Sequence, residues 1–92
     1  MQKKNFLRTI DEGFGFKFCN GQIATNLQGL LNHIKVLSPS DFAHHVYFDH
    51  NDFANWIIDI IEDEKLGRDI FHSNKEQTVA LLQARINYLK ER

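Results

Sequence analysis

The fold of this chain is decided by the stretch Asn51-Asp52-Phe53-Ala54-Asn55-Trp56-Ile57-Ile58-Asp59-Ile60-Ile61. Asn51 is a preferred helix cap, and Asp52 places a negative charge in the first turn, where it meets the positive end of the helix dipole. Apolar side chains then recur at helical spacing, at Phe53, Trp56, Ile57, Ile60 and Ile61. The pattern therefore predicts a helix over this stretch.

The same helix is apolar on more than one side, because Ile58 lies off the main stripe. A wide apolar face is typical of a central helix that packs against two neighbours. Trp56 lies in the middle of that face, so we expect it to be largely buried against the first long helix, near Leu30 or Ile34. The residues expected to hold the fold together are Phe42, His45, Asn51, Asp52, Phe53, Trp56 and Ile57.

Four further helices are predicted, two before the central helix and two after it. Their apolar faces, in chain order, are Leu27-Leu30-Leu31-Ile34, Phe42-His45-Val46, Leu66-Ile70-Phe71 and Val79-Leu82-Ile86-Leu89. Their start signals are Thr25 or Asn26 for the first, Ser38 followed by Pro39 for the second, Asp63 for the third, and Ser73 or Asn74 for the last. Residues 47–50 are expected to close the second helix.

An aromatic segment before the first helix has the period of a half-buried strand, with Phe14, Phe16 and Phe18 at alternate positions. The turn dipeptide Asn20-Gly21 follows it. A lone strand leaves its backbone groups unpaired, so it needs a partner. Residues 4–10 are one candidate partner, and a second copy of the chain is another. The third interpretation is an aromatic loop that lies over the helices.

The chain as a whole has the length and composition of one small globular domain spanning residues 1–92. We predict a mainly α fold, a compact bundle of about five helices with a short N-terminal aromatic strand or hairpin. The pattern leaves open that residues 1–12 are flexible. The net charge of −1 gives no overall field that attracts nucleic acid or an anionic membrane. No apolar stretch approaches the roughly 20 residues that span a bilayer, and no signal-peptide pattern is present, so a cytoplasmic location is expected.

Three linked patterns stand out between residues 14 and 70. They are the aromatic strand Phe16-Lys17-Phe18-Cys19-Asn20-Gly21 leading to Leu27, Leu30 and Leu31; Phe42 followed by His45-Val46; and Asn51-Asp52-Phe53-Ala54-Asn55-Trp56-Ile57 with Asp59, Asp63 and Leu66 behind it. Together they resemble a small prokaryotic domain family of unknown function, whose members are found alone or attached to other domains. The resemblance implies a compact, mostly helical domain and implies no chemistry.

The densest set of potential metal ligands is the run from His44 to Asp52, which holds three His and two Asp side chains. Within it, His45, Asp49 and His50 are the candidate ligands for zinc or a non-haem metal. On a helix, however, His44 and His45 diverge by about 100°, and His45 shares the apolar face. We therefore favour a structural His45 whose ring donates to a backbone carbonyl or a carboxylate, with no metal and no cofactor.

No catalytic residue is predicted, and we expect the protein not to be an enzyme. Cys19 is the only cysteine, which excludes an internal disulfide and a Cys-based zinc site. No Ser or Cys lies in a recognisable nucleophile setting, and Gly13-Phe14-Gly15 lacks the pattern of a phosphate-binding loop. A domain of this size also has little room for a pocket that encloses a substrate.

The function that these patterns favour is a small module for protein–protein interaction or regulation, with a homodimer as one form of that interaction. The expected surface combines the narrow apolar seam of the last helix with the aromatic strand; its residues are Val79, Leu82, Ile86, Leu89, Phe14 and Phe16. The alternative role of the seam is to close the domain's own core.

A nucleic-acid-binding protein is the alternative from another class, and a small metal-binding domain that uses the His/Asp run is the third. Aromatic residues that alternate with Lys17, after three basic residues within positions 3–8, are typical of surfaces that stack single-stranded bases. We favour instead an aromatic segment that faces the core. The acidic residues between positions 59 and 64 would also repel phosphates nearby.

Overall fold

Helices make up most of this computed structural model, which describes residues 5–91. Within that range there are five α-helices: α1 (Leu27–Lys35), α2 (Pro39–His45), α3 (Asp52–Trp56), α4 (Glu64–Ile70) and α5 (Lys75–Lys90). A 3-10 turn, η1 (Glu12–Phe14), precedes the first strand, and a π-helical turn, η2 (Ile57–Ile61), continues α3. Four two-residue strands form two hairpins: β1 (Phe16–Lys17) with β2 (Ile23–Ala24), and β3 (Val46–Tyr47) with β4 (His50–Asn51).

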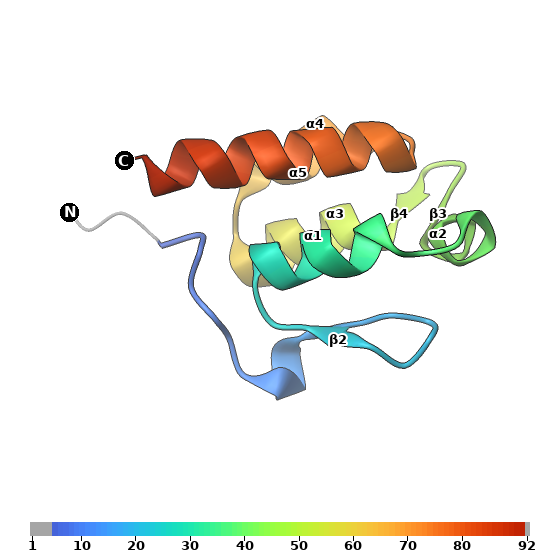
Figure 1. Ribbon diagram of the computed structural model, residues 1–92, viewed down its shortest axis with the longest axis horizontal. Helices are drawn as coiled ribbons and strands as arrows, with labels where there is room; N and C mark the ends of the chain where they lie inside the picture. Colours follow the sequence, from blue (N-terminus) through green and yellow to red (C-terminus); the bar gives the residue numbers. More distant parts are fainter. Residues whose placement is uncertain (1–4, 92) are drawn as a thin grey trace.

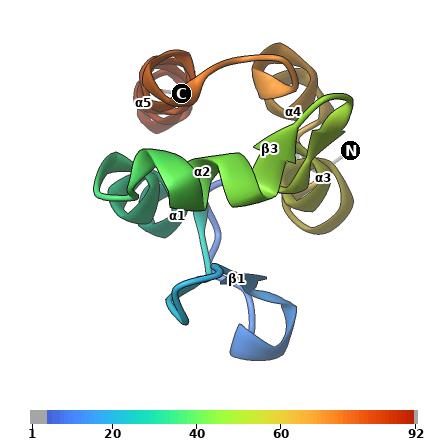
Figure 2. The same cartoon turned by 90° about the vertical axis from the view of Figure 1, so that its right-hand side faces the viewer.

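The helices are stacked in two layers, with the first hairpin beyond the second layer. α4 and α5 lie side by side in one layer, and α1 and α3 lie in the next (Figure 1, Figure 2). Hairpin β1–β2 lies on the side of α1 and α3 that faces away from α4 and α5. α5 packs against both α1 and α4, and α4 packs against α3. The mainly α bundle with an N-terminal aromatic hairpin is therefore confirmed.

Each α-helix begins after a polar residue whose side chain accepts a hydrogen bond from the first turn. The caps Asn26, Ser38, Asn51, Asp63 and Asn74 accept from the backbone N–H groups of Gly29, Asp41, Ala54, Leu66 and Gln77, in that order. These bonds satisfy donors that a helix start otherwise leaves unpaired. The start signals in the sequence are confirmed, with Asn26 and not Thr25, and Asn74 and not Ser73, as the caps.

The aromatic strand finds its partner directly after the Asn20-Gly21 turn. β1 and β2 run antiparallel, with Phe16 opposite Ala24. Gly21 has φ +92°, a conformation that suits glycine at a tight turn. Within the chain the strand therefore pairs with residues 23–24 and not with the candidate segment 4–10, because the chain reverses on itself after the turn. The strand does not need a second copy to find a partner.

A second hairpin, β3–β4, replaces the simple end of α2 that we expected at residues 47–50. Its strands pair antiparallel and leave Phe48 and Asp49 as a two-residue loop. Phe48 has φ 49°, in the left-handed region. Two-residue loops use this conformation, normally with Gly or Asn at the position. Position 48 holds Phe and not Gly or Asn, so the sequence carries no signal for a hairpin here.

The central helix is buried on several sides, as its pattern predicts. Phe53 and Ile57 are fully buried, and Trp56 is 8% exposed. The Nε1–H of Trp56 donates to the carbonyl of Phe14 at 2.8 Å, and its ring meets the ring of Phe16 edge-on with centroids 6.1 Å apart. The predicted burial of Trp56 is confirmed, and the aromatic segment before α1 supplies its hydrogen-bond partner. Its contact with Leu30 or Ile34 in α1 stays a prediction.

Arg8 ties the N-terminal segment to the end of the central helix. Its guanidinium donates to the carbonyls of Ile60 at 2.9 Å and Ile61 at 3.0 Å, groups that a helix end leaves open. Phe6, Leu7 and Ile10 also pack against the core. Of the segment 1–12, residues 5–12 are thus anchored, and residues 1–4 lie outside the described residues.

Gly67 allows α4 to lie directly against the central helix. A Cβ added at Gly67 would overlap the Ile58 side chain and come within 3.1 Å of the Ala54 carbonyl oxygen. Ala is favoured over Gly in a helix by about 1 kcal/mol, so any loss of stability must come from this overlap. We predict that Gly67→Ala lowers the free energy of unfolding by about 1–3 kcal/mol, measured by urea denaturation.

Gly13→Ala is the control for this prediction, because a Cβ at Gly13 has no neighbouring atom within 4 Å. It should leave the unfolding midpoint unchanged or raise it slightly, because Ala restricts the unfolded chain more than Gly does. A Gly67→Ala variant as stable as the wild type would show that α4 can move away from Ile58 without cost.

Candidate functional site

His45 is a buried side chain at the end of α2, and both of its ring nitrogens are engaged. The side chain is 6% exposed. Nε2 accepts the backbone N–H of Cys19 at 3.1 Å, and Nδ1 lies 2.9 Å from Oδ2 of Asp52. Because Nε2 acts as an acceptor, the proton lies on Nδ1, which donates to the carboxylate. The burial and the carboxylate partner expected for His45 are therefore both present, and its ring joins the first hairpin to α3.

The carboxylate of Asp52 binds a second histidine from hairpin β3–β4. Its Oδ1 lies 2.6 Å from Nε2 of His50. The His50 ring in turn stacks on Tyr47, with centroids 4.7 Å apart and an angle of 22° between the planes. Asp52 thus holds α2 and the hairpin on the first turn of α3.

The candidate metal ligands do not converge. His45 uses both ring nitrogens within the protein, and His50 points its Nε2 at Asp52. Asp49 lies exposed at the hairpin turn. Among the residues that the structure describes, no group of three His, Cys, Asp or Glu side chains is placed to hold a metal ion.

Cys19 is exposed, and its thiol lies 3.9 Å from the backbone carbonyl of Asp41. Partial loss of water around the thiolate raises the pKa of Cys19, and the negative charge of Asp41 raises it further. A nucleophilic cysteine needs the opposite, a lowered pKa and a free base beside it. Nε2 of His45 is already occupied by the backbone N–H of Cys19 itself. The arrangement does not activate the thiol.

The apolar seam of α5 lies mostly inside the chain's own core. Leu82 and Ile86 are fully buried, and Val79 and Leu89 pack against the core as partly buried residues. α5 has α1 as its neighbour on this side. The assignment of Leu82 and Ile86 to an exposed interaction surface is corrected, because neither has area left to offer a partner.

The aromatic segment is also mainly core. Phe16 is 6% exposed, and its ring centroid lies 4.8 Å from that of Phe18 and 4.9 Å from that of Phe53. Only Phe14 of the expected surface remains largely exposed, at 62%. Phe16 and Phe18 would have to leave the core to stack on nucleic-acid bases.

The most exposed aromatic side chain within residues 5–91 is one that the sequence patterns did not single out. Phe48, at the tip of hairpin β3–β4, is 97% exposed, and the neighbouring Tyr47 is 49% exposed. We define the hairpin tip as Tyr47, Phe48 and Asp49. The only sequence signal for it is the pair of adjacent aromatics between two helices, a pattern that fits the end of α2 equally well.

Asn51 fixes the position of this tip. It is fully buried, and its Nδ2 donates to the carbonyls of Ile70 at 3.1 Å and Phe71 at 3.0 Å. Its Oδ1 accepts from the N–H of Ala54 at 3.0 Å. One side chain therefore joins the second hairpin, the start of α3 and the end of α4.

Comparison of the chain with protein-family models, with curated proteins and with solved structures found no match. The family resemblance of residues 14–70 therefore stays a prediction. No helix among residues 5–91 is long and apolar enough to cross a membrane. The candidate site rests on the geometry of the chain itself.

We predict that Asn51→Asp destabilises the protein although the two side chains have the same shape. The carboxylate keeps the cap on Ala54 but cannot donate, so it would face the carbonyls of Ile70 and Phe71 with a buried negative charge. The free energy of unfolding should fall by about 3 kcal/mol or more at neutral pH, measured by urea denaturation. Asn74→Asp, at an exposed cap, should cost little by comparison.

We predict that the thiol of Cys19 is alkylated slowly in the folded protein. Because its pKa is raised, the reactive thiolate fraction at pH 8 is smaller than in the unfolded chain, and the rate should keep rising as the pH increases beyond the range of an ordinary thiol. Asp41→Asn should accelerate alkylation by iodoacetamide, whereas Asp49→Asn should leave it unchanged. Equal rates in the folded and urea-unfolded wild type would contradict the prediction.

Proposed function

We propose that this domain is a small non-enzymatic protein–protein interaction module that presents the hairpin tip to its partner. The observation that carries the proposal is Phe48, whose side chain is 97% exposed while its backbone has φ 49°. Each of these properties is unfavourable for the isolated domain. Together they favour a role for Phe48 outside its own chain.

A left-handed backbone at a bulky residue lowers the stability of the fold. The Cβ atom comes too close to the following carbonyl oxygen, which costs roughly 1–2 kcal/mol. Gly or Asn normally occupies this position of a two-residue loop for that reason. Residues held in sparsely populated backbone regions cluster at functional sites. The strain at Phe48 supports selection for its side chain.

Two adjacent aromatic side chains lie at the tip. The ring centroids of Phe48 and Tyr47 are 6.3 Å apart. Phe48 is almost fully exposed, and Tyr47 is about half exposed. A single exposed apolar residue is common on protein surfaces. A protruding aromatic pair instead resembles the anchors that fill pockets on a partner and supply most of the binding energy.

The tip is held in place before any partner binds. Tyr47 stacks on His50, which is bonded to Asp52 in α3. Asn51 ties the base of the hairpin to the end of α4. Because these contacts already order the loop, binding a partner would cost little further conformational entropy. This rigidity supports a binding role.

The side chains suited to chemistry are committed elsewhere. His45 uses both ring nitrogens as structural contacts, and the raised pKa of Cys19 keeps its thiol protonated at neutral pH. Phe16 and Phe18 are in the core. These arrangements favour binding over catalysis, and a protein partner over stacked nucleic-acid bases.

We predict that Phe48→Gly separates folding from binding. Gly adopts φ 49° without steric cost, and this gain exceeds its extra freedom in the unfolded chain. The free energy of unfolding should rise by roughly 0.5–1 kcal/mol, with a melting temperature a few degrees higher. The same variant should no longer retain the protein that the immobilised wild-type domain captures from an extract of its source cell, as read by mass spectrometry.

Val36→Ala is the matched control, because Val36 is 79% exposed but lies at the end of α1 with φ −104°. It should leave the captured protein and the melting temperature unchanged. If Phe48→Gly still captures the same protein as the wild type, the tip is not the recognition surface. If Phe48→Gly melts at a lower temperature, the Phe48 side chain stabilises the fold and the argument from strain is wrong.

A further inference from the structure

We propose that Asn20 is a site of covalent self-modification, at which the side-chain amide is lost as ammonia and becomes a carboxyl group. The reaction takes up one water molecule and needs no enzyme. The inference is independent of the proposed function. It rests on the residue that follows Asn20, on the exposure of the first hairpin turn, and on the hydrogen bonds that close this turn.

The reaction joins two groups that are neighbours along the chain. The backbone nitrogen of Gly21 gives up its proton and attacks Cγ of Asn20. The Cγ–Nδ2 bond then breaks, and the amide nitrogen takes up a proton and leaves as ammonia, so that a five-membered succinimide ring remains. Water opens this ring at one of its two carbonyl carbons. One opening gives aspartate, and the other gives isoaspartate, in which the backbone continues through Cγ.

Asn20 is the asparagine best placed for this chemistry, because it is the only one in the chain that precedes a glycine. Asparagine is among the thermally labile residues of proteins. Gly21 has no Cβ atom, so its backbone nitrogen is open to close approach. Each of the other seven asparagines precedes a larger residue, whose side chain shields the nitrogen that would have to attack.

The turn that holds Asn20 lies on the surface and is supported by little regular structure. Residues 19–23 are all exposed, and strands β1 and β2 are two residues long. A segment with few buried contacts and exposed hydrogen bonds opens at a lower free energy than the whole domain unfolds. The turn therefore opens locally while Phe18 and Ala24, which are buried on either side of it, stay in the core.

The closed turn holds both reacting groups in hydrogen bonds. The N–H of Gly21 donates to the carbonyl of Phe18 at 2.9 Å, and Oδ1 of Asn20 accepts the N–H of Gln22 at 3.0 Å. The nitrogen gives up its proton less readily while it donates, and the Asn20 side chain cannot turn freely while it accepts. The reaction therefore proceeds from the open turn, and its rate follows the fraction of molecules in which the turn is open.

Isoaspartate at position 20 would disconnect the first hairpin from the histidine at the end of α2. The route through Cγ lengthens the backbone by one C–C bond, about 1.5 Å. The hydrogen bond from the N–H of Phe18 to the carbonyl of Gln22, at 2.8 Å, spans this position. The N–H of Cys19, which donates to Nε2 of His45 at 3.1 Å, comes directly before it. We expect the isoaspartate form to lose both bonds.

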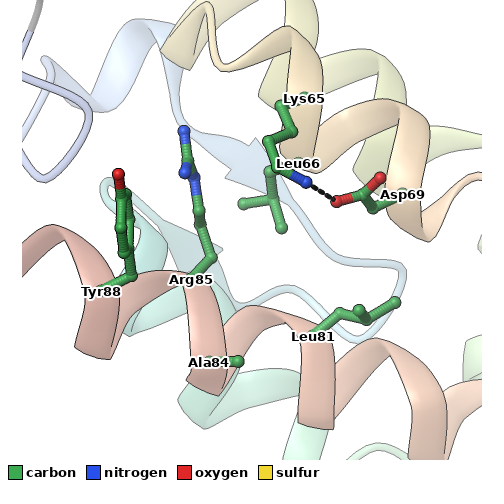
Figure 3. Close-up of a pocket in the computed structure, with 7 residues that line it drawn as sticks. All are labelled: Lys65, Leu66, Asp69, Leu81, Ala84, Arg85 and Tyr88. Carbon is green, nitrogen blue, oxygen red and sulfur yellow. Dashed lines mark hydrogen bonds and ion pairs between the residues drawn. The ribbon is translucent and has the colours of Figure 1, made fainter.

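Asn87 is the internal control for this reactivity. It is exposed, as Asn20 is, but it lies within α5 and precedes Tyr88, whose side chain lines the groove between α4 and α5 (Figure 3). Inside a helix, the N–H of the following residue is bonded to the preceding turn, and the backbone is fixed. Exposure of an asparagine alone therefore does not permit the reaction.

The first test is peptide mapping by mass spectrometry of the folded protein stored at pH 8 and 37 °C. Aspartate and isoaspartate should both accumulate at Asn20, while Asn87 stays unchanged. In urea, where the turn is always open, conversion of Asn20 should be roughly tenfold faster or more. Conversion of Asn87 before Asn20, or equal rates at Asn20 in the folded and unfolded protein, would overturn the inference. So would a folded protein in which Asn20 never converts while the unfolded chain converts completely.

The second test compares the two products, which carry the same charge and differ only in the path of the backbone. The isoaspartate form is isolated by chromatography, and the aspartate form is made as Asn20→Asp. Asn20→Asp keeps an acceptor for the N–H of Gln22 and should melt like the wild type. The isoaspartate form should melt a few degrees lower, and its Cys19 amide proton should exchange faster by NMR. Identical melting and exchange in the two forms would show that the longer backbone does not disturb the contact with His45.

Discussion

The buried amide of Asn51 constrains the rest of the structure. Its oxygen caps α3, and its nitrogen donates to the two carbonyls that end α4, at 3.1 and 3.0 Å. Only an amide can accept on one side and donate twice on the other in this geometry. Asn51 therefore sets the distance between the two helix layers and, because it belongs to β4, the direction of the hairpin as well.

Next to this amide, a carboxylate and two histidines form a polar cluster at the edge of an aromatic core. Asp52 bonds His45 on one side and His50 on the other. The ring of His45 also lies within 5.2 Å of the Phe16 and Phe53 rings, measured between centroids. Among residues 5–91 no buried side-chain nitrogen or oxygen is left without a hydrogen bond. The cluster thus aligns α2, α3 and both hairpins, and this use explains a run of His and Asp that otherwise resembles a ligand set.

Much of the fold could be read from the sequence because local rules decide it. Polar caps such as Asn51 and Asp63, and apolar spacing such as that of Leu27 and Leu30, each act within one or two turns. The partner of the aromatic strand was not predicted from residues 20–24, because two-residue strands carry almost no periodicity. The π-helical turn at residues 57–61 has no sequence signature either, since it depends on packing around it.

The candidate site was predicted less well than the fold. The burial of His45 follows from its place on an apolar helix face. Phe48 has no signal in the sequence, because it is distinguished by a backbone angle and an exposed fraction, and neither follows from residue type. Leu82 and Leu81 are adjacent, yet one is buried and the other lines a groove. Which of two apolar neighbours faces outward depends on where α1 and α4 lie, and that is a tertiary property.

The anchoring of Arg8 on the carbonyls of Ile60 and Ile61 has a consequence for how the chain folds. These contacts span 52 and 53 residues of sequence, and α5 completes the core by packing on α1, which is also distant along the chain. Closing such long loops has an entropic cost before the contacts form. During synthesis, the first aromatic hairpin and α1 must therefore wait for residues 60–90 before their apolar faces are covered. In that interval the growing chain exposes Phe16, Leu30 and their neighbours, which is when it is most prone to aggregate.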